Sequence, residues 1–314
     1  MTLEPPPSGT ASSEPCGVVV VLKPPGITSH DVVNLLRRRF GTRRVGHTGT
    51  LDPMATGVIV ACVGPATRIA EYLPSDPKEY EAEIHLGIET DTEDVTGQTV
   101  AVADASNVTE ADALRALEGF RGAVIQTPPM VSAVKVGGER LYKLARKGIT
   151  ADRPPRRVEI YDLRLLSFEP GQRARLRVRV LCSPRTYIRT LAADLGRSLG
   201  TGGALAALTR TRVGAYRLED AEPVNTCHRV RPIAEALPDW PWGMAGCKAA
   251  EELQHGRPVM AADVRWIRPL ADADRALIES EDGGLLVIAS VEGECIRPKK
   301  VLAAQGDGNH GANA

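Results

Sequence analysis

Short apolar runs separated by turn residues make up most of the chain, and their lengths are typical of strands. Residues 17–22 and 58–63 are continuous apolar runs, which is the pattern of a buried strand. Residues 78–86 and 174–181 alternate apolar and polar side chains, which is the pattern of a strand with one solvated face. Residues 158–168 are also expected to form a strand. We therefore expect a protein built mainly on a sheet.

Apolar spacing of three and four residues predicts a smaller number of helices. Thr28 or Ser29 can cap a helix that ends near Phe40, and Thr109 opens a second one that stops at Gly119. Further helices are expected over residues 68–73, 139–147, 186–199 and, as a short helix, 205–208. Many strands interleaved with few helices predict an α+β fold with a mixed, mainly antiparallel sheet.

The composition predicts two folded units. The segments before and after them lack the apolar pattern of a folded core. Prolines interrupt the pattern near residues 227–241, and strands at 276–279 and 285–291 follow with Gly283-Gly284 as their turn. The predicted parts are a disordered leader (1–15), a large catalytic unit (16–229), a small β-rich unit (230–302) and a disordered tail (303–314).

Charge is balanced overall and uneven along the chain. The 314 residues are 43% hydrophobic and 25% charged, and 39 Lys and Arg against 39 Asp and Glu leave a formal net charge of +0. Basic side chains gather at residues 37–44 and 135–157, and arginines alternate along residues 173–179. These segments are interpreted either as solvated faces or as a surface for a polyanion.

Several common kinds of site are missing from the sequence. The six cysteines form no C-x-x-C pair and the histidines never occur at ligand spacing, so no metal site is predicted. No Walker A loop or G-x-S-x-G elbow occurs. Neither a signal peptide nor an apolar run of ~18 residues is present, so we expect a cytoplasmic protein without a membrane span.

One loop, residues 43–57, concentrates residues that can do chemistry. Arg43 and Arg44 lead into glycines, His47 and the single acid Asp52, and a buried strand follows. A carboxylate on a Gly-rich turn beside a rigid strand indicates a positioned reactive group, nucleophile or general base. The alternative interpretation is an Asp-Pro turn between strands.

This loop resembles the catalytic signature of the TruB family of tRNA pseudouridine synthases, and four other family blocks appear in the expected order. The blocks are Lys23-Pro24-Pro25-Gly26-Ile27-Thr28-Ser29, Gly46–Gly57, Lys78-Glu79-Tyr80, Gln126–Pro129 with Ser132–Lys135, and Tyr187-Ile188-Arg189. The resemblance covers residues 17–218. Two positions depart from the family pattern: Thr50 replaces a common alanine, and Pro184-Arg185 replaces a common lysine-glycine pair.

The resemblance implies roles for individual residues. Asp52 would be the nucleophile, Arg189 would pair with it and keep it ionised and oriented, and Tyr80 would stack on the extracted base and assist proton removal. Arg189 as a surface arginine and Tyr80 as a core aromatic are the alternatives. Substrate and RNA contacts would come from Lys23, His47, Tyr187, Leu208, Arg43, Arg44 and Lys135.

The implied function is isomerisation of uridine 55 in the tRNA T-loop, on a base flipped out of its stack. The implied fold is a pseudouridine synthase catalytic domain with a small PUA-like, RNA-binding domain after it. The reaction adds no atom and is redox-neutral, so no cofactor or metal is expected, nor is a guide RNA or an oligomer. Two other hypotheses are a non-catalytic RNA-folding module and a relative that acts on other RNA under guidance.

Overall fold

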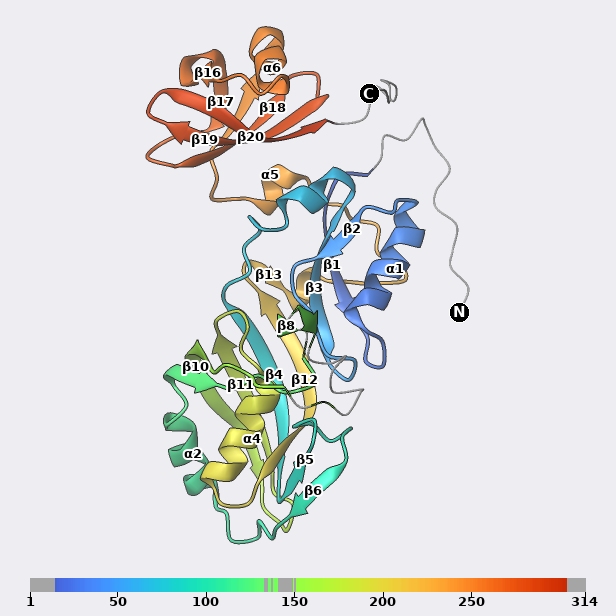
Figure 1. Cartoon of the computed structure of the whole chain (residues 1–314), viewed down its shortest axis with the longest axis vertical. Coiled ribbons are helices and arrows are strands. Elements are labelled where there is room, and N and C mark those ends of the chain that lie inside the picture. The colour runs from blue at the N-terminus through green and yellow to red at the C-terminus, as the bar shows by residue number, and fades with distance from the viewer. Residues whose placement is uncertain (1–14, 133–134, 137, 141–148, 150, 304–314) are drawn as a thin grey trace.

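The computed structural model describes residues 15–132, 135–136, 138–140, 149 and 151–303 of the chain. Two mainly β units follow one another along the long axis of the molecule, with the C-terminal unit at one end (Figure 1). No helix of the described residues is long and apolar enough to cross a membrane. The predicted leader up to residue 14, the tail from residue 304, and most of the helix expected over 139–147 lie outside the described residues.

The larger unit contains most of the elements. Its strands are β1 (Gly17–Lys23), β2 (Val45–His47), β3 (Thr56–Val63), β4 (Lys78–Leu86), β5 (Ile88–Thr90), β6 (Thr99–Val102), β7 (Gly122–Gln126), β8 (Lys135–Val136), β9 (Glu139–Arg140), β10 (Arg156–Glu169), β11 (Arg175–Cys182), β12 (Gly203–Val213), β13 (Tyr216–Arg217) and β14 (Glu222–Pro223). Its helices are α1 (Ser29–Phe40), α2 (Glu110–Glu118), α4 (Ile188–Ser198) and α5 (Ile233–Ala236), with the 3-10 turns η1 (Gly64–Ile69) and η2 (Leu218–Asp220).

One ten-stranded sheet forms the body of this unit. Its order is β14-β1-β3-β12-β4-β11-β10-β7, with β2 paired to β3 and β13 paired to β12. The β1–β14 and β3–β12 pairs are parallel and the other pairs are antiparallel. Helix α2 packs on β10 and α4 on β12 (Figure 1). The predicted mixed, mainly antiparallel sheet is confirmed.

Local sequence signals account for several of these elements. Thr28 caps α1 in a capping box with Asp31, and Thr109 does the same for α2 with Asp112. Strand β4 buries every second side chain, as its alternation predicts. On β11, Arg177 and Arg179 lie 3.5 and 3.7 Å from Glu81 of β4, so these arginines pair with a neighbouring strand on the solvated face.

Three predicted helices are wrong where the structure describes them. The helix expected over 68–73 is instead the end of the 3-10 turn η1, which stops at Ile69, followed by turn residues. The short helix expected over 205–208 is part of strand β12, because pairing with β4 in the middle of the sheet outweighs the local spacing. Further along β12, Thr209 and Arg210 pair with β3. Gly57, with φ +117°, permits this pairing: a Cβ there would lie 2.2 Å from the Arg210 carbonyl oxygen. The helix expected from residue 139 begins instead as β9, paired with β8.

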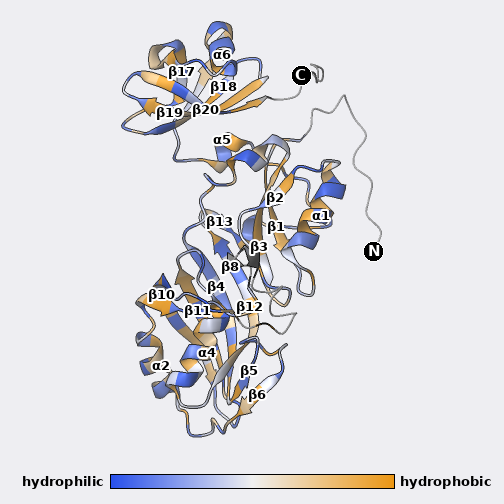
Figure 2. Cartoon of the chain, in the orientation of Figure 1, coloured by the Kyte–Doolittle hydropathy of each residue, from blue (hydrophilic) through white to orange (hydrophobic). Residues whose placement is uncertain are grey.

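The C-terminal unit is a six-stranded sheet of order β16-β20-β19-β18-β15-β17. Its elements are β15 (Trp242–Ala245), α6 (Cys247–Gln254), β16 (Val259–Met260), η3 (Ala261–Asp263), β17 (Val264–Arg268), β18 (Arg275–Ser280), β19 (Leu285–Glu292) and β20 (Cys295–Ala303). Hydrophobic residues concentrate on strands in both units (Figure 2). One cluster joins the units, because Val18 and Val20 share it with Ile233, Leu277 and Ile288.

The expected division at residue 229/230 lies within packed structure. The Val18 amide donates to the Arg231 carbonyl at 2.8 Å, the reverse bond is also 2.8 Å, and Ile233 of α5 is buried in the shared cluster. We infer that the units divide between α5 and β15, after the segment that packs on β1.

Candidate active site

A cleft of about 540 Å³ opens beside the loop that carries Asp52. We call it the Asp52 cleft. Of the residues predicted from the sequence, it is lined by His47, Asp52, Tyr80, Tyr187, Arg189 and Leu208. The structure therefore brings together side chains from β2, the loop before β3, β4, the start of α4 and β12.

The other predicted contact residues lie elsewhere. Lys23 is fully buried beneath the loop, so the structure does not place it with a surface that RNA can reach. Arg43 and Arg44 are exposed and do not line the cleft. The side chain of Lys135 lies outside the described part of the structure.

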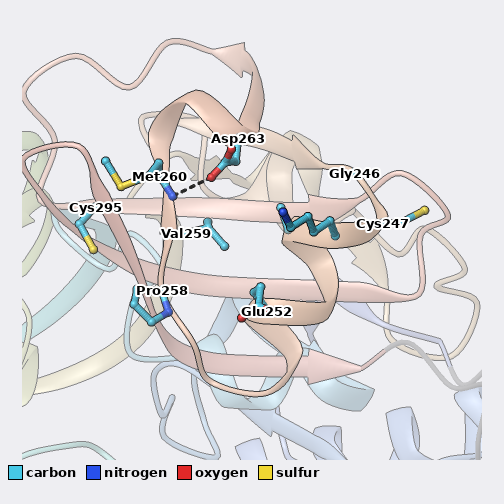
Figure 3. A pocket seen from close by; sticks show the side chains of 10 residues that line it. Gly246, Cys247, Glu252, Pro258, Val259, Met260, Asp263 and Cys295 are labelled. Atoms are coloured by element: carbon cyan, nitrogen blue, oxygen red, sulfur yellow. Dashed lines mark hydrogen bonds between the residues drawn. The ribbon is translucent and has the colours of Figure 1, made fainter.

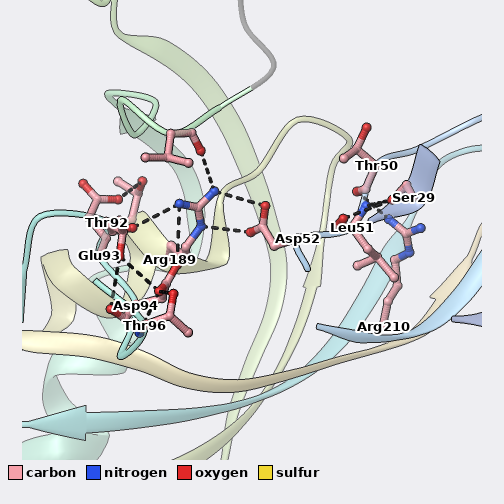
Figure 4. A network of polar contacts seen from close by, with 12 residues as sticks. Ser29, Thr50, Leu51, Asp52, Thr92, Glu93, Asp94, Thr96, Arg189 and Arg210 are labelled. Atoms are coloured by element: carbon pink, nitrogen blue, oxygen red, sulfur yellow. Dashed lines mark hydrogen bonds and ion pairs between the residues drawn. The ribbon is translucent and has the colours of Figure 1, made fainter. Parts of the chain in front are cut away.

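Arg189 holds both oxygens of the Asp52 carboxylate. Its Nε donates to Oδ2 at 2.9 Å and its Nη2 donates to Oδ1 at 3.1 Å (Figure 4). The Arg189 side chain is 3% exposed, while that of Asp52 is 34% exposed. A two-point pair of this kind fixes orientation as well as charge, so the carboxylate is held from one side and open to the cleft on the other.

The rest of the Arg189 guanidinium is also occupied. Nη1 donates to the Thr92 carbonyl at 3.0 Å and Nη2 donates to the Val131 carbonyl at 2.8 Å. The carboxylate of Asp94, which is nearly buried, lies 3.7 Å from Nη1. Since every direction of the guanidinium has an acceptor, Arg189 has little freedom to leave Asp52.

Buried polar side chains hold the backbone on both sides of Asp52. The Leu51 amide donates to Ser29 Oγ at 2.8 Å, and Ser29 Oγ donates to the Leu51 carbonyl at 3.0 Å. Lys23 Nζ donates to the carbonyls of Pro53 at 3.1 Å and Ala55 at 2.6 Å. Burial lowers the pKa of Lys23 to about 8, and the nearby Asp52 opposes that effect.

Arg210, from β12, holds the preceding part of the loop. Its Nη1 and Nη2 donate to the carbonyls of Thr50 at 3.2 Å and Gly49 at 3.0 Å, and its Nε donates to Val58 at 2.8 Å. Arg210 is 1% exposed. The loop is thus fixed by side chains from three other elements, so an alternative position of Asp52 would break several buried hydrogen bonds.

Tyr80 and Lys78 form the β4 side of the cleft. Burial raises the pKa of the Tyr80 phenol, and the Arg210 guanidinium beside it acts in the opposite direction. Burial, with help from Arg210, lowers the pKa of Lys78 to about 8. Lys78 is 9% exposed and Tyr80 6%, so the cleft wall presents one aromatic ring and one nearly buried amine.

Comparisons with known proteins identify the family. Residues 37–188 match the family model described as TruB family pseudouridylate synthase (N terminal domain). The tRNA pseudouridine synthase B of Symbiobacterium thermophilum is 51% identical over 250 residues, which are 78% of this chain and 84% of that protein. This chain belongs to the TruB family. The enzyme of the same name from Moorella thermoacetica is 42% identical, over 91% of this chain and 99% of its own.

Solved structures confirm the fold of this TruB-family chain. A Cbf5-Nop10-Gar1 complex contains a chain that matches with a TM-score of 0.65 at 24% identity, over 92% of this chain and 86% of that one. An H/ACA RNP bound to a substrate RNA containing 2'-deoxyuridine matches with a TM-score of 0.63 at 22% identity, over 91% and 84%. The predicted family, the fold class and the assignment to the pseudouridine-forming isomerases are confirmed.

Gln126, from the fourth block, fixes the backbone of Tyr187 in this TruB-family chain. Gln126 is 1% exposed. Its Nε2 donates to the Tyr187 carbonyl at 3.1 Å and its Oε1 accepts from the Tyr187 amide at 2.9 Å.

His47 is mostly buried, which lowers its pKa, and its Nδ1 has no hydrogen-bond partner among the described residues.

Four residues of this TruB-family site were not predicted: Lys78, Asp94, Gln126 and Arg210. Lys78 and Gln126 stand inside blocks that the sequence revealed, so block membership was the available signal. Asp94 belongs to an acidic turn, and Arg210 to a segment of uncertain local pattern. Only the structure distinguishes Asp94 and Arg210 from surface charges, because it places Asp94 beside Arg189 and Arg210 beneath the Asp52 loop.

A second hollow of about 490 Å³ lies in the C-terminal unit of this TruB-family chain and shares no residue with the Asp52 cleft (Figure 3). It is lined by Cys247, Lys248, Glu252, Met260, Asp263 and Cys295 among others. Within the described residues, no group of three or more His, Cys, Asp or Glu could hold a metal ion.

Proposed function

We propose that this enzyme converts uridine 55 in the T-loop of tRNA to pseudouridine, with Asp52 as the nucleophile. The observation that carries the proposal is the two-point pair of Asp52 with the buried Arg189 at the wall of an open cleft. Relatives of 51% and 42% identity that bear the name tRNA pseudouridine synthase B support tRNA as the substrate.

The reaction exchanges one glycosidic bond for another. The bond from ribose C1′ to N1 breaks, a bond from C1′ to C5 forms, C5 loses a proton and N1 gains one. Asp52 would attack the nucleotide at the ribose or the pyrimidine ring, and so let uracil detach and rotate. Arg189 would keep the carboxylate charged and aimed throughout, because its two donors bind both carboxylate oxygens.

The base must leave its stack before Asp52 can reach it. Tyr80 would stack on the extruded base, and Leu208 and Tyr187 would form the wall of its pocket. His47 would fill the space that the base leaves. The neutral imidazole that burial favours suits stacking against bases. Arg43, Arg44 and Lys135 would contact phosphates, whose binding weakens as salt rises.

We favour action on tRNA without a guide RNA, as a monomer in the cytoplasm. The Moorella thermoacetica relative is matched over 99% of its length and is named for tRNA, whereas the H/ACA RNP chain is matched at 22% identity, which carries the fold alone. The pairing of Asp52 with Arg189 argues against a non-catalytic RNA-folding module, because such a module needs no aimed carboxylate.

The test is pseudouridine mapping on unmodified tRNA transcript incubated with the purified protein alone. Product at T-loop uridine 55 is expected. Asp52→Asn should lower turnover by more than about 1,000-fold while tRNA affinity stays within about threefold, because the change removes the nucleophile and no phosphate contact. Asp162→Asn, which breaks an exposed ion pair with Arg164, is the matched control and should be fully active. An active Asp52→Asn enzyme, or product only with an added guide, contradicts the proposal.

A further inference from the structure

A second cleft adjoins the Asp52 cleft and is lined by arginines. Its volume is about 600 Å³, and its lining is Ser75, Arg156, Arg157, Val158, Pro184 and Arg185. Ser75, Pro184 and Arg185 line the Asp52 cleft as well. The two clefts are therefore continuous at these three residues, and we call the second one the arginine cleft.

Hydrogen bonds between β10 and the loop before α4 fix the arginines relative to one another. The Ser183 amide donates to the Glu159 carbonyl at 2.8 Å, and the Glu159 amide donates to Ser183 Oγ at 2.9 Å. Arg156 and Arg157 begin the same strand, and Arg185 follows Ser183 in the same loop. The three guanidinium groups thus come from backbone that is tied together, not from independent loops.

Arg185 has a backbone conformation that disfavours an arginine. Its φ is +70°, in the left-handed region where glycine is preferred. The resembling family commonly has lysine-glycine where this chain has Pro184-Arg185. In this chain the residue in the left-handed conformation carries a cationic side chain. Strain of this kind at a cleft rim is typical of functional positions.

The arginines of this cleft are wholly or partly open to solvent. Arg157 and Arg185 are exposed and Arg156 is partly exposed. None of the three forms an ion pair with a carboxylate in the part of the chain that the structure describes. The nearby Asp76 is occupied, because it accepts the Tyr161 hydroxyl at 3.0 Å. An anion that enters the cleft would meet Arg185 at the shared rim and an arginine of β10, each with a guanidinium that can bind a phosphate through two N–H groups.

We propose that Arg185, with Arg156 and Arg157, binds an RNA phosphodiester next to the target nucleotide and so positions the strand beside the Asp52 cleft. This rests on the proposed function, because an RNA base in the Asp52 cleft places its flanking backbone at the shared rim. Phosphate contacts fix the register of a nucleic acid without reading its bases. Arg185 is thus a positioning residue that holds the target nucleotide through its backbone.

The experiment measures binding of T-arm stem-loops to the Asp52→Asn protein by fluorescence anisotropy. Each stem-loop carries one neutral methylphosphonate in place of a single phosphate around the target uridine. With the arginines intact, one or two flanking positions should weaken binding by on the order of tenfold. Arg185→Gly, whose glycine suits φ +70°, should weaken binding of unmodified RNA to a similar extent. Its affinity for the stem-loops modified at those one or two positions should be no lower than its affinity for unmodified RNA.

Salt dependence and matched variants complete the test. Arg185→Gly should lower the slope of log affinity against log salt by about 1. Arg185→Lys should recover part of the affinity, and Arg115→Ala on α2, which removes an exposed guanidinium far from either lining, should change neither quantity.

Two results would overturn the phosphate subsite. One is unchanged binding by Arg185→Gly. The other is that Arg185→Gly weakens the binding of every methylphosphonate stem-loop by the same factor as it weakens the binding of unmodified RNA. The two effects would then be independent, and Arg185 would contact none of those phosphates. Because binding is measured without turnover, these results are independent of the mapping assay, and a failure of the proposed function would appear there as absence of pseudouridine.

Discussion

Asp94 and Arg189 face each other at 3.7 Å on the side of the guanidinium that does not hold Asp52. Asp94 Oδ1 accepts from Thr92 Oγ1 at 3.0 Å, from the Thr96 amide at 3.0 Å and from Thr96 Oγ1 at 2.5 Å. The same turn presents the Thr92 carbonyl to Arg189. Asp94 therefore shapes the turn that orients the arginine of the catalytic pair, as Figure 4 shows.

Asp94 should matter for turnover more than for RNA binding. Asp94→Ala removes the acceptor on which the turn is folded, and a shift of Arg189 by about 1 Å is expected to lower kcat on the order of 100-fold. Asp94→Asn keeps an acceptor oxygen and should stay within about fivefold of the unchanged enzyme. Single-turnover and steady-state kinetics on tRNA transcript measure the split between kcat and KM. If Asp94→Ala and Asp94→Asn lower kcat equally, Asp94 does not orient Arg189 by shaping the turn.

Tyr80→Phe should keep RNA affinity and lower kcat by about 100-fold, the usual size of a general acid–base contribution. Burial raises the pKa of the Tyr80 phenol and the Arg210 guanidinium opposes part of that rise, so the neutral hydroxyl is the form that would take part in proton transfer. Rates of pseudouridine formation at saturating tRNA test this. Tyr216→Phe, a buried tyrosine of the shared cluster, is the control. If the Tyr80→Phe enzyme is fully active, the Tyr80 hydroxyl has no role in the reaction and the ring serves only to pack and stack.

Lys78 should make the stability of the free enzyme depend on pH. Burial, followed by the charge of Arg210, sets the pKa of Lys78 to about 8 in the folded chain against 10.5 for the ordinary side chain. Between these values the unfolded chain binds more protons, so stability rises with pH in that window.

Comparison with Lys78→Met isolates this effect. From pH 7.5 to 10.5, the free energy of unfolding of the natural enzyme should rise relative to Lys78→Met by about 3 kcal/mol, and urea titrations at each pH measure it. The other buried lysine, Lys23, is present in both proteins and cancels. Parallel pH profiles for the two proteins would show that Lys78 has an ordinary pKa.

Replacing Arg185 should reveal the strain of its backbone. Because φ is +70°, Arg185→Gly should be more stable than Arg185→Ala by about 1 kcal/mol. At Arg115 within α2 the order should reverse by a similar amount, since alanine favours a helix. Denaturant unfolding of the four variants gives both differences. The same order at both positions would mean that Arg185 is not held in the left-handed region.

Local patterns predicted elements whose signals come from residues close together in the sequence, and failed where pairing between distant segments decides the structure. The alternation of β4 and the caps at Thr28 and Thr109 depend on neighbours in sequence, so they could be inferred from it. Strand β12 could not, because Leu205 and Leu208 have helical spacing and only pairing with β4 makes them strand residues.

The site shows the same division. Asp52, Tyr80 and Arg189 lie in recognisable blocks, and the structure brings all three to one cleft. Nothing local distinguishes Asp94 from its acidic neighbours or Arg210 from other arginines. Their importance comes from burial next to groups that are far away along the chain, which no short pattern records.

The packing of β20 on the catalytic unit has a consequence for dissecting this enzyme. Arg68 Nη1 donates to the Val301 carbonyl at 2.6 Å, Lys300 donates to the Arg68 carbonyl at 2.7 Å and pairs with Glu71, and the cluster around Val18 extends to Leu302. A chain cut after α5 would expose the apolar face of the sheet that carries the Asp52 loop, and this exposed surface would favour aggregation. The two units should therefore be expressed, mutated and crystallised together.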